Sequence, residues 1–180
     1  SEAHVRYAHE IIAQMPEALR TAVNECFSAR CVVYGILLDK DETARESQLK
    51  ELAGLTDSTS IKTCRQLLPE IDGLAVHLRV PLLDIAKGVL KEMTVGQFND
   101  FKGTIDAIIK SDERLELFEW LVKKSLISHL ERHFGVKVPP KAANAKLSSC
   151  RDEAARVLST IAHAGHKKAE EATASYRSAV

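Results

Sequence analysis

The large apolar residues of this chain recur at steps of three and four along most of its length. Phe98, Phe101 and Ile105 illustrate the spacing, which returns each side chain to the same side of a helix after one turn. A half-buried strand would instead alternate apolar and polar residues at every second position. Residues 74–80 do alternate, but Pro81 closes this run and no second run is present to pair with it. The spacing therefore predicts an all-α fold without a sheet.

Capping and turn residues divide this pattern into about seven or eight helices. Thr94 and Gln97 have the spacing of a capping box, and Gly135 is the kind of residue that ends a helix. Pro69 lies inside an apolar stripe, where we expect it to end or kink the helix. The expected helices cover residues 16–38, 42–55, 58–71, 74–80 after a kink, 81–93, 94–110 and 111–134, and a last helix follows residue 149.

A chain of 180 residues suits a single compact domain that buries a core without disulfide bonds. We expect residues 1–136 to form the main helical core of this domain. Pro139 and Pro140 predict a loop over residues 137–144. Residues 145–180 are expected to form a C-terminal helix that packs on the core and has a frayed end.

Phe101, Phe118 and Leu121 belong to the two strongest apolar stripes of the sequence. A short turn near Ser111 joins these two stripes, so the two helices are expected to pack antiparallel. We therefore expect all three side chains in the core.

The charge balance argues against nucleic acid as a partner, and the lack of long apolar runs argues against a membrane-spanning segment. The chain has 25 basic and 25 acidic residues, so no net charge favours binding to nucleic acid. No run approaches the ~20 apolar residues of a membrane span, and residues 1–10 lack the apolar stretch of a signal peptide. The 4 cysteines form no C-x-x-C pair, and we expect Cys26, Cys64 and Cys150 to be reduced thiols on apolar helix faces.

The sequence contains no complete catalytic motif, and we predict no catalytic residue in it. His9-Glu10 begins like the H-E-x-x-H helix of zinc proteases, in which a second histidine one turn later binds the same metal. Ala13 occupies that position, so the set of ligands is incomplete. A glycine-rich phosphate loop and a G-x-S-x-G nucleophile elbow are also absent from the sequence. We therefore expect no enzyme activity and no cofactor in this chain alone.

Two sets of residues are weak candidates for metal binding. His129 and His133 are one helical turn apart and share a face, although histidines near a helix C-terminus also complement the helix dipole. Asp112, Glu116 and Glu119 share a face at the start of an expected helix, where the dipole by itself favours acidic residues. Three carboxylates on one helix cannot surround a cation without oxygens from another segment. We therefore expect structural roles for both sets, and no metal site.

Five stretches of the sequence, taken in order, resemble a known family. They are residues 34–39 (YGILLD), 78–83 (LRVPLL), 97–101 (QFNDF), 111–120 (SDERLELFEW) and 157–166 (VLSTIAHAGH). Together they resemble the C-terminal soluble region of bacterial HtpX-like membrane zinc metallopeptidases, which are relatives of the CAAX prenyl endopeptidases and are described as zinc-dependent proteases with chaperone function.

In that family the H-E-x-x-H segment and its zinc lie in an earlier domain, near membrane-spanning helices. The resemblance therefore implies a non-catalytic regulatory or protein-interaction domain whose partner is its own membrane protease domain. It also implies a location on the cytoplasmic side of the bacterial inner membrane. Under this hypothesis zinc belongs to the parent protease and not to this chain.

The acidic stretch from Asp112 to Glu119 also resembles the helix start of tellurite-resistance TerB-like helical domains. Those domains often carry Asp-Gly where this chain has Asp112-Glu113. This second resemblance implies a TerB-like arrangement of the helices. It leaves an alternative function open, a free-standing TerB-like module that senses metal or stress.

Overall fold

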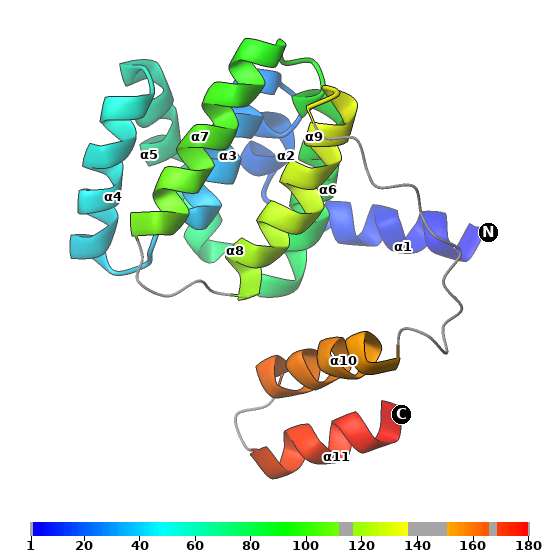
Figure 1. Ribbon diagram of the computed structural model, residues 1–180. Coiled ribbons are helices and arrows are strands. Elements are labelled where there is room, and N and C mark those ends of the chain that lie inside the picture. Colours follow the sequence, from blue (N-terminus) through cyan, green and yellow to red (C-terminus); the bar gives the residue numbers. More distant parts are fainter. Residues whose placement is uncertain (1, 112–116, 137–150, 166–168, 180) are drawn as a thin grey trace. The chain divides into compact units, whose positions relative to one another are not determined.

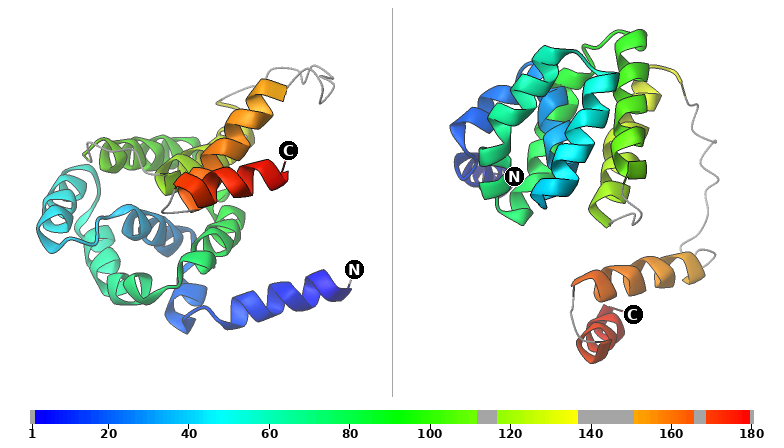
Figure 2. Two further views of the ribbon diagram at one scale, coloured as in Figure 1. Left: turned by 90° about the horizontal axis from the view of Figure 1, so that it is seen from below. Right: turned by 90° about the vertical axis from the view of Figure 1, so that its left-hand side faces the viewer.

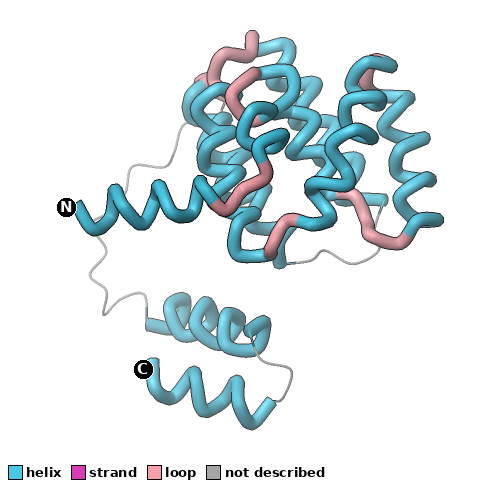
Figure 3. Tube along the Cα trace, turned by 180° about the vertical axis from the view of Figure 1, so that it is seen from behind, coloured by secondary structure: helices cyan, strands magenta, loops and turns pink. Residues whose placement is uncertain are grey.

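The computed structural model describes residues 2–111, 117–136, 151–165 and 169–179. The chain divides into two compact units, residues 1–137 and 138–180 (Figure 1). The described residues form helices and connecting loops and include no strand (Figure 3), which confirms the all-α prediction. None of the described helices combines the length and the apolar character needed to cross a bilayer.

The first unit is built around a helix that is buried on all sides. Along α3, the buried side chains include Cys31, Val32, Val33 and Tyr34, which together point in every direction around the helix axis. A helix of this kind must be covered by others, and α5, α6 and α7 pack against it (Figure 1). The unit comprises α1 (Glu2–Ala13), α2 (Glu17–Ala22), α3 (Cys26–Leu37), α4 (Glu42–Leu55), α5 (Ser58–Gly73), α6 (Val76–Leu90), α7 (Val95–Ser111), α8 (Leu117–Leu121), the π-helix η1 (Val122–Ile127) and α9 (Ser128–His133).

Three helix boundaries follow the capping signals of the sequence. Thr94 and Gln97 form the expected capping box: the Gln97 backbone N–H donates to Thr94 Oγ1 at 3.2 Å, and the Thr94 N–H donates to Gln97 Oε1 at 2.9 Å. Asp57 caps α5 in the same manner through the backbone N–H of Ser60, at 2.9 Å. Gly135, with a φ of 68°, follows the end of α9 and confirms the predicted stop.

The helix expected over residues 16–38 is divided in two at Asn24. The side-chain amide of Asn24 donates to the carbonyl oxygen of Arg20 at 2.7 Å. In a continuous helix the backbone N–H of residue 24 would bind that oxygen, so the side chain competes with the helix. The hydroxyl of Ser28 then satisfies the carbonyl oxygen of Ala22 at 2.7 Å, which stabilises the break between α2 and α3.

Both prolines that were expected to bound helices lie inside them. Pro69 is within α5 and does not end it, and Pro81 is within α6, so the helices expected over residues 74–80 and 81–93 form one continuous helix. A proline in a helix interior costs about 3 kcal/mol, which a single buried helix face can offset. Each proline has buried apolar neighbours in its own helix: Leu67, Leu68 and Ile71 in α5, and Leu78, Leu82 and Leu83 in α6.

The chain from α8 to α9 runs antiparallel to α7, as predicted. Phe98 stacks on Phe134 with 4.8 Å between ring centroids, whereas Asp106, two turns further along α7, pairs with Lys123 at 2.8 Å. Phe101 is fully buried, as expected. The expected core positions Phe118 and Leu121 are only partly buried. The sequence also did not predict that the middle of this stretch is a π-helix, η1.

The second unit is a pair of helices, α10 (Arg151–Gly165) and α11 (Ala169–Ala179), which lie side by side in both views of Figure 2. The sequence analysis expected one C-terminal helix with a frayed end, but the structure places a second helix there. On α10, Ala162 is buried, whereas Val157 and Ile161 are exposed. The packing of this unit on the core remains a prediction.

Candidate functional site

The two histidines proposed as weak metal ligands lie on α9, one turn apart. His133 Nε2 is 3.2 Å from the carbonyl oxygen of Lys91, to which it donates when it carries a proton. The His133 ring also meets the ring of Phe134 edge-on, with centroids 4.8 Å apart. These contacts fix His133 against the end of α6 and occupy one of its two ring nitrogens.

The surroundings of His129 are cationic. Partial burial lowers the pKa of His129, and the positive charge of Lys91 lowers it further. Arg132 and Lys87 act on this pKa in the same direction. Three cationic side chains around one imidazole repel a metal ion. The same side chains are favoured by the partial negative charge at the C-terminal ends of α6 and α9, so this part of the structure has a structural role.

The acidic candidates Asp112 and Glu116 lie outside the described residues, as does the side chain of Glu119. His9 and Ala13, at the incomplete zinc-protease motif, both lie on α1. Among the residues that the structure describes, no three His, Cys, Asp or Glu side chains come together as a metal-binding group.

A serine and a lysine that the sequence analysis did not single out come together between α6 and η1. Lys87 Nζ donates to Ser125 Oγ at 2.7 Å and to a carboxylate oxygen of Asp84 at 2.5 Å. Serine–lysine pairs act as nucleophile and base in some hydrolases, but the base must be a neutral amine. Here Lys87 donates a hydrogen bond to the hydroxyl of Ser125 and forms an ion pair with the carboxylate of Asp84. The arrangement therefore has the geometry of a structural contact.

The cavity beside this pair is too small for a substrate. Its volume is about 10 Å³, and its walls include Val80 and Leu83 of α6 and Leu121 and Leu126 on the opposite side. A space of this size holds about one water molecule. No spacing rule could have found the pair, because Lys87 and Ser125 are 38 residues apart in sequence and a π-helix sets the direction of Ser125.

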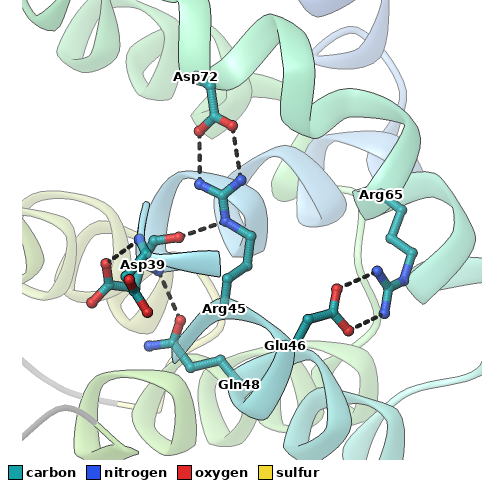
Figure 4. A network of polar contacts seen from close by, with 7 residues as sticks. Asp39, Arg45, Glu46, Gln48, Arg65 and Asp72 are labelled. Carbon is teal, nitrogen blue, oxygen red and sulfur yellow. Dashed lines mark hydrogen bonds and ion pairs between the residues drawn. The ribbon is translucent and has the colours of Figure 1, made fainter. Parts of the chain in front are cut away.

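The strongest polar contacts join α4 to α5 (Figure 4). Arg45 makes two hydrogen bonds of 2.8 Å to the carboxylate of Asp72, and Arg65 makes a similar pair to Glu46 at 2.6 and 2.8 Å. The bonds from Arg65 lower the pKa of Glu46, and those to Asp72 raise the pKa of Arg45. The carboxylates of Asp72 and Glu46 each have a guanidinium partner, and the Asp39 carboxylate accepts the backbone N–H of Asp41 at 2.8 Å, so the network holds the two helices together.

An apolar surface lies at the start of α6 and along α8. Val76 is 75% exposed and Val80, one turn later on α6, is 39% exposed. On α8, Trp120 is 46% exposed and Leu121 shares the small cavity with Val80. Arg79 lies over the ring of Phe118 at 5.7 Å, which brings the two helices together. We call Val76, Val80, Phe118 and Leu121 the α6–α8 surface; Trp120 is exposed on another side of α8.

Comparisons with protein-family models, with curated proteins and with solved structures found no match for this chain. The fold class is therefore established by the structure alone. The resemblances to HtpX-like metallopeptidases and to TerB-like domains remain hypotheses.

Proposed function

We propose that this chain is a non-catalytic protein-interaction domain of a membrane-bound zinc metallopeptidase, and that the α6–α8 surface binds the protease domain of the same protein. The observation that carries the proposal is the exposure of Val76 and Val80 on α6 beside the partly buried Phe118 and Leu121 of α8. Scattered apolar residues are normal on protein surfaces, whereas neighbouring ones mark contact sites.

Two further features support this proposal. The five ordered stretches that resemble HtpX-like metallopeptidases extend from residue 34 to residue 166 and so include both α6 and α8. Ala13 stands where the zinc-protease helix needs its second histidine, so the zinc of such a protein would be held by another domain.

The surface has the chemistry of a modest interface. Full burial of one valine side chain contributes roughly 1.5–3 kcal/mol, so Val76 alone can change an affinity by about tenfold or more. Arg79 and Asp84 lie between Val76 and Phe118 in sequence, on α6, and can form a polar rim.

The test is a binding titration between this chain and the zinc-protease domain encoded with it. Val76→Asp places a carboxylate on the apolar surface and is expected to weaken binding at least tenfold. Leu55→Asp is the matched control, because Leu55 is 51% exposed but lies at the end of α4. Equal binding by both variants would refute the role of the α6–α8 surface, and the absence of binding by the wild-type chain would refute the proposed partner.

A second assay tests the absence of catalysis. The purified chain is expected to leave casein intact in the presence of zinc. Digestion that stops when a zinc chelator is added would show that the chain is itself a protease.

A further inference from the structure

Two cysteines from different helices meet in the core of the first unit. Cys31 lies on α3 and Cys64 on α5, and the side chains of both are 0% exposed. The Cys64 thiol donates to the carbonyl oxygen of Cys31, with 3.4 Å between sulfur and oxygen. The two thiols therefore lie on facing sides of neighbouring helices.

The helices approach each other closely at this place. One turn after Cys31, a Cβ atom on Gly35 would lie 3.7 Å from Leu68, which is one turn after Cys64. The two helices thus run parallel, and a Cβ atom on Gly35 would also lie 2.6 Å from Cδ1 of Ile71 on α5, so the helices are in close contact. A disulfide requires Cβ atoms about 3.5–4.5 Å apart, a separation that only helices in close contact provide.

The two thiols differ in character. The hydrogen bond that Cys64 makes to the Cys31 side chain lowers the pKa of Cys31, against the opposing effect of burial. The positive charge of Arg30 lowers it further. The same hydrogen bond, together with burial, raises the pKa of Cys64. Because the Cys64 thiol directs its hydrogen at Cys31, Cys31 is the thiol assigned to react first.

We propose that Cys31 and Cys64 form a redox-active dithiol, which a hydroperoxide converts into a disulfide that joins α3 to α5. Cys31 sulfur attacks one oxygen of hydrogen peroxide, the O–O bond breaks, and a sulfenic acid and one water molecule result. Cys64 sulfur then attacks the Cys31 sulfur. The S–O bond breaks, the S–S bond forms, and the hydroxyl leaves as a second water molecule with the proton of Cys64.

The burial of both thiols determines how the reaction proceeds. Hydrogen peroxide must reach Cys31 through a local opening of α3 and α5, so the reaction is slow but is confined to these two partners once it begins. The resulting bond closes a loop through α4 and makes the pair of helices harder to separate. Cys26, which is partly exposed at the start of α3, provides an internal comparison for simple exposure to oxidant.

The test uses the wild-type chain, folded and treated with hydrogen peroxide. Remaining thiols are alkylated after denaturation, and the protein is digested with trypsin, which releases Cys31 in the peptide 31–40 and Cys64 in the peptide 63–65. We expect these two peptides to be joined, with the loss of two hydrogen atoms, and to separate after reduction. The midpoint of urea unfolding should rise on oxidation and return on reduction.

Variants test the assignment further. Cys64→Ala should prevent the loss of two hydrogens, whereas Cys26→Ala should leave it unchanged. Oxidation confined to Cys26, a disulfide from Cys31 to any other cysteine, or a bond that forms only in denaturant would each overturn the proposal. The measurement on the wild-type chain decides the question even if Cys64→Ala fails to fold.

Discussion

Replacing Gly35 by alanine sets two opposing free energies against each other at the contact between α3 and α5. Gly35 is inside α3, where alanine is favoured over glycine by about 1 kcal/mol because it restricts the unfolded chain. However, a Cβ atom at this position would lie 2.6 Å from Cδ1 of Ile71. Ile71 is 2% exposed, so its side chain has little room to move away.

The packing cost should exceed the gain in helix propensity. An extra methyl group in a well-packed core costs about 1–3 kcal/mol, so Gly35→Ala is expected to destabilise the protein by roughly 0–2 kcal/mol after the gain of about 1 kcal/mol. Gly103 in α7 is the matched control, because a Cβ atom there would meet nothing within 4 Å. Gly103→Ala should therefore stabilise the protein by about 0.5–1 kcal/mol.

Urea unfolding followed by circular dichroism measures both variants. The two free energies of unfolding should differ by about 1–3 kcal/mol, the packing cost alone. Ile71→Val removes the methyl group that Gly35→Ala would meet and costs about 0.5–1.5 kcal/mol by itself. The double variant should be more stable than the sum of the single effects predicts. If Gly35→Ala stabilises the protein as much as Gly103→Ala does, the close contact between α3 and α5 is refuted.

Three further predictions follow from individual side chains. The hydrogen bonds from Ser60 lower the pKa of Asp57 in the folded state, so the stabilisation that they give is present above the unfolded pKa of ~3.9 and is lost as pH falls through the folded pKa. Asp57→Asn should therefore remove this part of the acid dependence of urea unfolding. An unchanged loss of stability in acid would contradict this assignment. Burial raises the pKa of Tyr34, so its neutral form contributes stability that is present below the unfolded pKa of about 10 and is lost at higher pH. In an alkaline absorbance titration, Tyr34 should ionise only as the protein unfolds. Ionisation of Tyr34 together with the other tyrosines would contradict its burial. Calorimetric titration with Ca²⁺, Mg²⁺ or Zn²⁺ should give no micromolar binding, whereas one-to-one binding that is lost in Asp112→Ala or Glu116→Ala would support the metal-sensing alternative.

Local signals in the sequence were sufficient to predict the helices and several of their ends. The spacing of apolar residues depends only on the helical period, and the capping box at Thr94 and Gln97 involves residues three apart. Gly135 could likewise be assigned to a stop because few other residues adopt a positive φ. The capping box and the glycine stop depend on neighbours in the chain and were confirmed, whereas the local contact of Asn24 with Arg20 that divides residues 16–38 was not foreseen.

Predictions that depend on tertiary packing were less successful. Pro69 and Pro81 have strong local preferences against helix interiors, which burial of the surrounding leucines outweighs. The sequence analysis placed Cys64 on an apolar face, but it could not pair Cys64 with Cys31, because the pairing depends on how α3 and α5 pack. The contact between Lys87 and Ser125 was missed for the same reason.

Mass spectrometry of the intact gene product tests most directly whether this chain is part of a membrane zinc metallopeptidase. The protein is purified from cells, its peptides are sequenced, and its zinc content is measured. We expect an H-E-x-x-H segment in the same polypeptide on the N-terminal side of Ser1, with one zinc ion bound there. A gene product that contains the 180 residues of this chain without such a segment would contradict the proposed function.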